Sequence, residues 1–186
     1  PVHPIGIGTW GIGGTWETVY GHEDEGIEAI QYSVAHGQNH IDSGQIYGQG
    51  YTDEIIGRAI KPLKREDLFL TDKVWETSVS KGKVRPAVET MLKKLGTDYL
   101  DVLYIHKPWE DWPWQEAISQ IDELIDRGVV RHFGVSNFAI PHMEQALKIA
   151  KHPIAVNQLH FNVCYKDDAT PAVQAFCKEH KIQIIA

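Results

Sequence analysis

The chain has 186 residues, of which 42% are apolar and 23% are charged, and its formal net charge is -7. These values are typical of a globular protein and exclude a disordered or collagen-like chain. The acidic balance, without any run of five or six Lys or Arg residues, argues against a nucleic acid or an anionic membrane as partner, so the expected ligand is a small molecule.

No membrane segment, secretion signal or metal site is expected. No stretch approaches the roughly 18 apolar residues of a transmembrane helix, and the amino terminus lacks the basic and apolar segments of a signal peptide, so we expect a cytoplasmic protein. Cys164 and Cys177 are the two cysteines, and no CxxC or Cys/His cluster accompanies them. The sequence therefore predicts neither a disulfide framework nor a zinc site.

Short β-rich apolar runs alternate with longer amphipathic segments, a pattern typical of a parallel sheet with crossover helices. Seven strands are predicted, over residues 5–10, 39–43, 68–74, 99–106, 130–135, 154–159 and from 182 onward. No linker or low-complexity tract interrupts them, so we expect a single domain over residues 1–186.

The predicted helices have recognisable ends. Acidic residues suit the positive end of a helix dipole, proline suits the first turn, and glycine suits the residue after the last turn. On these grounds we expect helices from the acids at 23–25 to Gly37, through 88–95 to Gly96, from 114 to Gly128, from Asn137 with Pro141 in the first turn to 150, and from Thr170 and Pro171 onward.

Each of five consecutive predicted strands ends in a polar residue where the apolar run stops. These residues are Asp42 with its neighbour Tyr47, then Lys73, His106, Asn137 and Gln158. In a parallel barrel these strand ends converge on the carboxyl-terminal face, where active sites are built. Taken singly, each has an ordinary interpretation: Asp42 and Lys73 as a structural ion pair, Tyr47 as a loop aromatic, and His106 as a core histidine.

Six sequence blocks resemble, in order, the signature blocks of the aldo-keto reductases. They are GTW (8–10), HIDSGQIYG with TDEIIG (40–48 and 52–57), DKVW (72–75), LDVLYIHKPW (100–109), GVVRHFGVSNF (128–138) and NQLHFN (157–162). The resemblance covers nearly the whole chain. It implies a (β/α)₈ TIM barrel that is incomplete here, with about six and a half βα units, because a full barrel takes about 250 residues.

The resemblance also implies an NAD(P)H-dependent reductase that transfers hydride to the carbonyl of a small aldehyde, ketone or sugar. Tyr47 would donate a proton to the carbonyl oxygen, Lys73 would stabilise the phenolate that remains, and Asp42 would hold Lys73 charged. His106 would position the carbonyl oxygen. These four are the predicted catalytic residues.

Further roles follow from the same resemblance. Ser136, Asn137 and Gln158 correspond to residues that hydrogen-bond the nicotinamide carboxamide, and Thr9 and Trp10 are placed with them in the cofactor site. Aromatic walls of the substrate pocket are expected from Trp10, Trp75 and Trp109. NADP(H) is expected rather than NAD(H), and it would bind without a Rossmann fold, because no GxGxxG motif opens a helix after the first strand.

Two features depart from the family pattern. His160 stands two residues after Gln158, where family members often carry a carboxylate, and Lys107, Pro108 and Trp109 follow His106. Both changes bear on the substrate pocket and leave the four catalytic positions intact.

The sequence leaves alternatives to an active reductase. One is a non-catalytic cofactor-sensing or scaffold protein with the same barrel, and another is an inactive fragment of the enzyme. An unclosed barrel would expose unpaired strand edges, so self-association with a further chain is also expected if the barrel is incomplete.

Overall fold

The computed structural model describes residues 1–109 and 112–186. They form two compact units, which are described separately below. The first unit comprises Pro1–Lys73 with Pro86–Asp101, and the second comprises Val74–Arg85 with Val102–Ala186. No helix in the described part of the chain is long and apolar enough to cross a membrane.

All seven predicted strands are present, and they are hydrogen-bonded in chain order. They are β1 (Ile7–Gly8), β2 (His40–Asp42), β3 (Phe69–Val74), β4 (Leu100–Ile105), β5 (Val130–Ser136), β6 (Ile154–Gln158) and β7 (Gln183–Ile185). The pairings of β1 with β2, β2 with β3, β5 with β6 and β6 with β7 are parallel. Alternating helices and parallel strands confirm the expected incomplete (β/α)₈ barrel.

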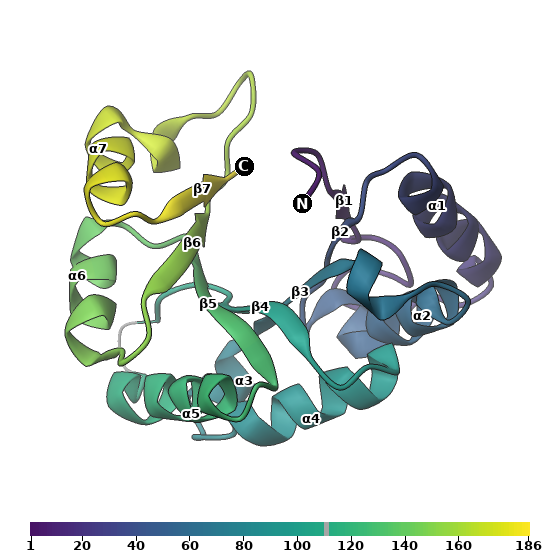
Figure 1. Ribbon diagram of the computed structural model, residues 1–186, viewed down its shortest axis with the longest axis horizontal. Coiled ribbons are helices and arrows are strands. Elements are labelled where there is room, and N and C mark those ends of the chain that lie inside the picture. Colours follow the sequence, from purple (N-terminus) through teal and green to yellow (C-terminus); the bar gives the residue numbers. More distant parts are fainter. Residues whose placement is uncertain (110–111) are drawn as a thin grey trace. The chain divides into compact units, whose positions relative to one another are not determined.

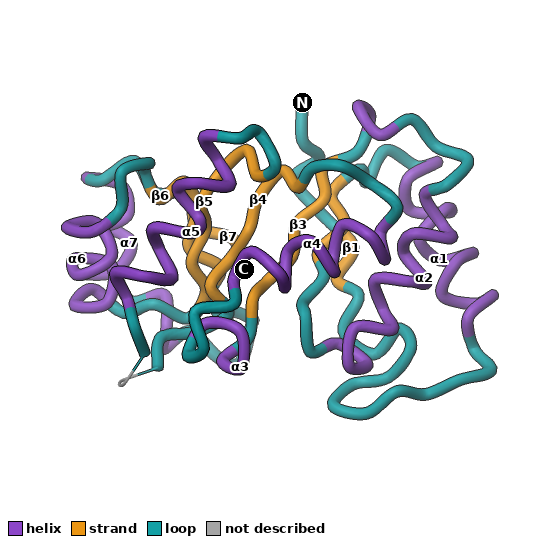
Figure 2. The backbone as a smooth tube through the Cα atoms, turned by 90° about the horizontal axis from the view of Figure 1, so that it is seen from below, coloured by secondary structure: helices purple, strands orange, loops and turns teal. Residues whose placement is uncertain are grey.

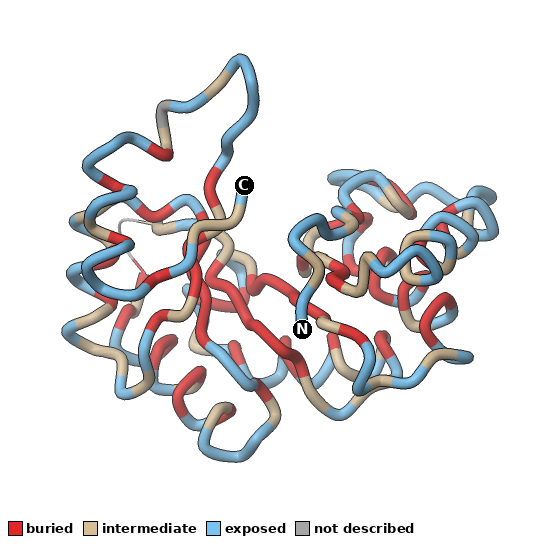
Figure 3. Tube along the Cα trace, turned by 45° about the horizontal axis from the view of Figure 1, so that its top comes forward, coloured by how far each residue is buried: buried red, intermediate tan, exposed pale blue. Residues whose placement is uncertain are grey.

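The helices are α1 (Glu23–Ala35), α2 (Tyr51–Ile60), α3 (Glu76–Val79), α4 (Val84–Leu95), α5 (Trp114–Asp126), α6 (Ile140–Ile149) and α7 (Pro171–Glu179). In the first unit α1 and α2 lie beside one another (Figure 1). In the second unit α6 and α7 lie beside one another next to β6 and β7 (Figures 1 and 2). In both units the buried residues gather on the strands and on one face of each longer helix (Figure 3).

Most predicted helix ends are confirmed. The first turn of α1 carries the acids at 23–25, and Thr170 caps α7 by accepting a hydrogen bond from the backbone N–H of Val173 at 3.3 Å. Gly96 follows α4 with a φ of +68°, the left-handed conformation that favours glycine after a helix.

Two helical expectations need correction. Asn137 does not begin a helix: its φ is +60°, and α6 starts three residues later, at Ile140. The reason is that Asn137 terminates β5 in a left-handed turn, a conformation that asparagine tolerates. In addition, α2 has no counterpart among the helices predicted above, although its apolar residues lie at helical spacing.

The packing of α2 on α4 depends on Gly57. A Cβ added there would meet the carbonyl oxygen of Lys94 and the backbone of Leu95 well inside van der Waals separation. The backbones of the two helices therefore approach one another at a point where only glycine fits.

Replacement of Gly57 by alanine should destabilise the chain, although alanine normally favours a helix by about 1 kcal/mol over glycine. The added methyl group forces α2 and α4 apart, and overpacking of this kind typically lowers the free energy of unfolding by about 1–3 kcal/mol. Urea unfolding followed by circular dichroism measures the change. Gly8→Ala is the control, because its added Cβ has nothing within 4 Å. A Gly57→Ala chain that unfolds at the wild-type urea concentration would contradict the close approach.

Candidate functional site

Three predicted catalytic residues lie together in the first unit. Asp42 ends β2, Lys73 lies near the end of β3, and Tyr47 begins a short 3₁₀ helix (Tyr47–Gly50) in the loop after β2. The Lys73 ammonium donates hydrogen bonds to Asp42 Oδ2 at 2.6 Å and to Tyr47 Oη at 3.1 Å. It donates another to the carbonyl oxygen of Ser43 at 2.6 Å. Because Lys73 is only 1% exposed, these acceptors replace the water that would otherwise surround its charge.

The Asp42 carboxylate is held on both oxygens. While Oδ2 accepts from Lys73, Oδ1 accepts from the hydroxyl of Thr71 at 2.7 Å, and Thr71 stands in register with Asp42 across the β2–β3 pair. The main-chain oxygen of Asp42 accepts from both the N–H and the hydroxyl of Thr9, at 3.1 and 2.8 Å. Thr9 is thus buried in the β1–β2 connection, and its role in cofactor binding stays a prediction.

Tyr47 is held in place by close neighbours on two sides. Its ring lies so near Gly44 that a Cβ at that glycine would come within 2.8 Å of it. Trp10 packs edge-on against it, with ring centroids 4.8 Å apart and an interplanar angle of 72°. Trp10 itself is 44% exposed, whereas Tyr47 is 9% exposed. The structure therefore places Trp10 beside the predicted proton donor and leaves part of the indole open to a ligand.

Two opposing effects act on the pKa of Tyr47. Burial raises the pKa of the phenol, while the Lys73 ammonium lowers it, and the net result is a pKa above the ordinary value. Lys73 therefore opposes the effect of burial without overcoming it. Burial lowers the pKa of Lys73. The charge of Asp42 and the contact with Tyr47 raise it, and together they outweigh burial, so the net pKa of Lys73 is above its ordinary value. Lys73 is accordingly charged and Tyr47 is protonated at neutral pH.

The second unit holds His106 and two of the predicted pocket aromatics. His106 follows β4, and its backbone N–H donates to the carbonyl oxygen of Val74 at 3.1 Å. The Trp75 ring lies perpendicular to the imidazole at a centroid distance of 4.9 Å, and Trp109 packs on Trp75 at 5.3 Å. The ammonium of Lys107 lies 5.1 Å from the centre of the Trp75 ring.

The three predicted carboxamide-binding residues also lie together in the second unit. Ser136 and Gln158 stand in register at the ends of β5 and β6. The Asn137 backbone N–H donates to the carbonyl oxygen of Gln158 at 2.9 Å. Its side-chain Nδ2 donates to the Ser136 hydroxyl and to the carbonyl oxygen of His106, both at 3.0 Å. The left-handed turn at Asn137 therefore links the ends of three strands.

The predicted site residues thus form two groups, one in each unit. Asp42, Tyr47 and Lys73 lie with Thr9 and Trp10, whereas His106 lies with the remaining cofactor and pocket residues of the second unit. The meeting of the two groups around one substrate stays a prediction.

Two buried acids near Lys73 were not among the predicted residues. Asp53 lies in α2 and Asp72 lies in β3, directly before Lys73. The sequence held a signal for Asp72, because an acid in the interior of an apolar strand is unusual. Asp72 and Lys73 are consecutive strand residues, so their side chains point to opposite faces of the sheet. Both acids are almost completely buried.

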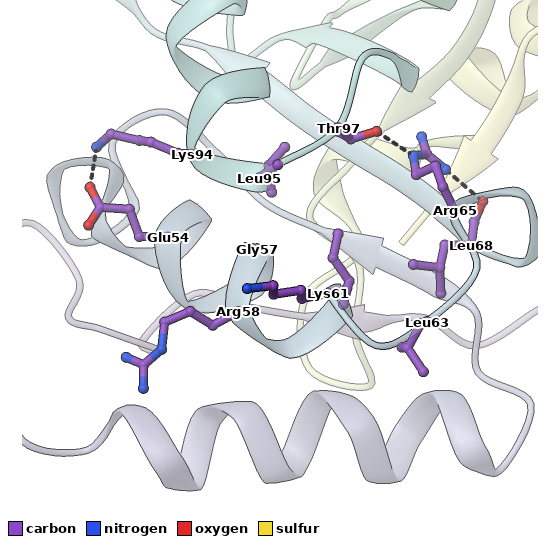
Figure 4. A pocket seen from close by; sticks show the side chains of 12 residues that line it. Glu54, Gly57, Arg58, Lys61, Leu63, Arg65, Leu68, Lys94, Leu95 and Thr97 are labelled. Atoms are coloured by element: carbon purple, nitrogen blue, oxygen red, sulfur yellow. Dashed lines mark hydrogen bonds and ion pairs between the residues drawn. The ribbon is translucent and has the colours of Figure 1, made fainter.

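A separate cavity of about 540 Å³ lies in the first unit along α2 and the end of α4 (Figure 4). Two of its cations are already engaged. Lys94 pairs with Glu54 at 3.2 Å, and Arg65 pairs with Asp101 at 2.7 Å. None of the predicted site residues is among those that line it, so the cavity is separate from the Lys73 cluster.

Comparisons with known proteins agree with the resemblance. The sequence pattern of the Aldo/keto reductase family matches residues 4–186. The aldo-keto reductase YhdN of Bacillus subtilis is 34% identical over 96% of this chain and 55% of its own length. The chain therefore spans about half the length of this curated relative.

Solved structures give the same result. The thermostable aldo-keto reductase Tm1743, in complex with the inhibitor epalrestat, superposes with a TM-score of 0.95 and 36% identity over 100% of this chain and 68% of its own. An aldo-keto reductase from Klebsiella pneumoniae in complex with NADPH has a TM-score of 0.89 and 28% identity, over 100% of this chain and 63% of its own. On the family pattern, the related sequences and the shared fold, the chain belongs to the aldo/keto reductase family.

Proposed function

We propose that this protein is an NADPH-dependent reductase of small aldehydes, ketones or sugars, with Tyr47 as the proton donor. The observation that carries the proposal is the hydrogen bond of 3.1 Å from the buried Lys73 ammonium to Tyr47 Oη, with Asp42 paired to the same ammonium at 2.6 Å. When bound, the reduced nicotinamide supplies the hydride that goes to the carbonyl carbon.

The direction of the hydrogen bond suits proton donation. Because Lys73 donates to Tyr47 Oη, the phenol is an acceptor in that contact, and the contact does not use the phenol hydrogen that would pass to a carbonyl oxygen. The raised pKa of Tyr47 keeps this hydrogen in place at neutral pH. As the proton leaves, the ammonium already lies beside the oxygen that becomes negative, which is the arrangement that lowers the barrier of such a step.

The proposed carboxamide site is supported by the chemistry of its donors. Ser136, Asn137 and Gln158 provide neutral hydroxyl and amide groups, which suit a neutral carboxamide. Since Nδ2 of Asn137 is already engaged with Ser136 and His106, its Oδ1 would accept from the carboxamide NH₂ group. His106 would hold the substrate oxygen, and Trp10, Trp75 and Trp109 would exclude water from the reacting atoms. The preference for NADPH rests on the relative that binds it.

Replacement of Tyr47 by phenylalanine should lower the turnover of carbonyl reduction by roughly 10²–10⁴-fold, because the ring remains while the proton donor is lost. NADPH affinity should change little. Steady-state oxidation of NADPH with a panel of aldehydes measures the first quantity, and tryptophan fluorescence titration with NADPH measures the second. The matched control is Tyr51→Phe, which removes a phenol bonded to Glu23 at 2.6 Å. Full activity in Tyr47→Phe would contradict the assigned role.

Replacement of Lys73 by methionine should lower turnover and move the alkaline limb of the pH–rate profile to higher pH. The sign follows from the charge: the ammonium lowers the pKa of Tyr47, so without it the phenol stays protonated to higher pH. Exposed Lys64→Met is the control. Thermal unfolding must accompany the assay, because removal of one partner of a buried pair leaves the other uncompensated. An unmoved limb in a folded Lys73→Met protein would leave Lys73 with a structural role alone.

A further inference from the structure

Asp53 and Asp72 form a second cluster of buried acids close to Lys73. They are 1% and 0% exposed, respectively. Asp53 Oδ1 accepts a hydrogen bond from the Ser43 hydroxyl at 2.6 Å, and Asp72 Oδ1 accepts one from the backbone N–H of Lys73 at 2.6 Å. The other oxygen of Asp72, Oδ2, is buried and has no hydrogen-bond partner among the described residues.

Neither nearby cation donates to this oxygen. The hydrogen bonds of Lys73 to Asp42, Ser43 and Tyr47 use all three N–H groups of its ammonium. The ammonium of Lys94, which also acts on Asp53, is bonded to Glu54 and to the carbonyl oxygen of Gly50. An ionised carboxylate with an unpartnered buried oxygen is strongly unfavourable, whereas a protonated carboxyl needs far less stabilisation.

The charges around the two acids point the same way. Burial raises the pKa of Asp72, the Asp53 charge raises it further, and the charge of Asp42 adds to both, while Lys73 acts in the opposite direction. Burial also raises the pKa of Asp53, with a smaller contribution of the same sign from Glu54. The Ser43 hydroxyl, Lys94 and Lys73 oppose this rise.

We propose that Asp53 and Asp72 share a proton at neutral pH and act as positioning residues for the Lys73 ammonium. Ser43 connects the two clusters, because its carbonyl oxygen accepts from Lys73 and its hydroxyl donates to Asp53. Asp72 in turn holds the Lys73 backbone. Asp53 thus acts on the ammonium end of Lys73 through Ser43, and Asp72 acts on its backbone. Neither acid accepts a hydrogen bond from the ammonium itself.

The shared proton has a consequence for Tyr47 that rests on the proposed function. Negative charge on Asp72 raises the pKa of the Tyr47 phenol. While the pair keeps its proton, Asp42 is the carboxylate that acts most directly on the ammonium. Loss of that proton adds negative charge near Lys73 and Tyr47, which makes a phenolate on Tyr47 less favourable.

The pair also predicts the pH dependence of stability. A carboxyl whose pKa is raised in the folded chain contributes stability that is fully present below its unfolded pKa of about 4 and is lost as pH rises through the folded value. Ionised, paired carboxylates have the opposite dependence. Because the pKa of Asp53 is raised to about 7, the wild-type chain should lose stability as pH rises from about 4 to about 7, and Asp72→Asn should reduce that loss.

Infrared spectroscopy of protein labelled with ¹³C at the aspartate carboxyl carbons tests the shared proton directly. At pH 7 we expect a protonated-carboxyl C=O band in the wild-type chain and its loss in Asp72→Asn, together with a flatter dependence of the urea midpoint on pH. Asp101→Asn is the matched control, because Asp101 is equally buried but paired with Arg65 at 2.7 Å; it should keep the band and lower the midpoint. If Asp72→Asn does not fold, Asp53→Asn replaces it as the test variant, with the same expected loss of the band. Absence of the band in the wild-type chain would overturn the shared proton.

The positioning role has its own readout. In Asp72→Asn the alkaline limb of the pH–rate profile should move to lower pH, opposite to the shift expected for Lys73→Met, because a charge that raises the pKa of Tyr47 is gone. If Asp72→Asn loses the infrared band but the alkaline limb of its pH–rate profile does not move, the link between the acid pair and Tyr47 is overturned. The infrared and unfolding measurements do not need catalysis, so failure of the proposed reductase activity is distinguishable from failure of the acid pair.

Discussion

A lysine ammonium that is almost completely withdrawn from water needs an acceptor for each of its three N–H groups, and this requirement determines much of the first unit. The acceptors of Lys73 come from a carboxylate, a main-chain carbonyl and a phenol, which lie at the end of β2 and in the loop after it. Parallel pairing of β2 with β3 brings these groups within reach. Thr71 and Thr9 then fix the carboxylate and the backbone of Asp42, so the cluster has little freedom to rearrange.

The second unit applies the same principle with neutral groups. The amide of Asn137 connects the ends of β4 and β5 through its bonds to His106 and Ser136, and the Asn137 backbone bonds to Gln158 at the end of β6. Side chains at the carboxyl ends of adjacent parallel strands are neighbours by construction, which is why this face of a barrel accommodates many different sites. Here the residues that would contact a cofactor are the same ones that join the strands.

The sequence was sufficient to predict the strands and the residues at their ends, because apolar runs and the polar residues after them are local signals. Asn137 was misread as the start of a helix, since its left-handed turn depends on bonds to residues from neighbouring strands. Helix α2 was missed because a segment of ten residues next to glycines gives a weak periodic signal. The acid pair was missed because Asp53 lies in a helix that was itself missed, and because no short sequence pattern reports the tertiary burial of either acid.

Burial of Tyr47 and burial of Lys73 act together in a way that neither does alone. Withdrawal from water raises the pKa of the phenol, which keeps the donor protonated, but it also strengthens every charge interaction around the phenol oxygen. In the proposed reaction the ammonium of Lys73 would gain little from a neutral phenol and much more from the negative oxygen that forms as the proton leaves. Its contribution would therefore be larger in the transition state than before it, which is the condition for an interaction to accelerate a reaction. The net rise in the phenol pKa is thus compatible with the proposed proton donation, because the opposing charge of Lys73 would act most strongly at the moment of transfer.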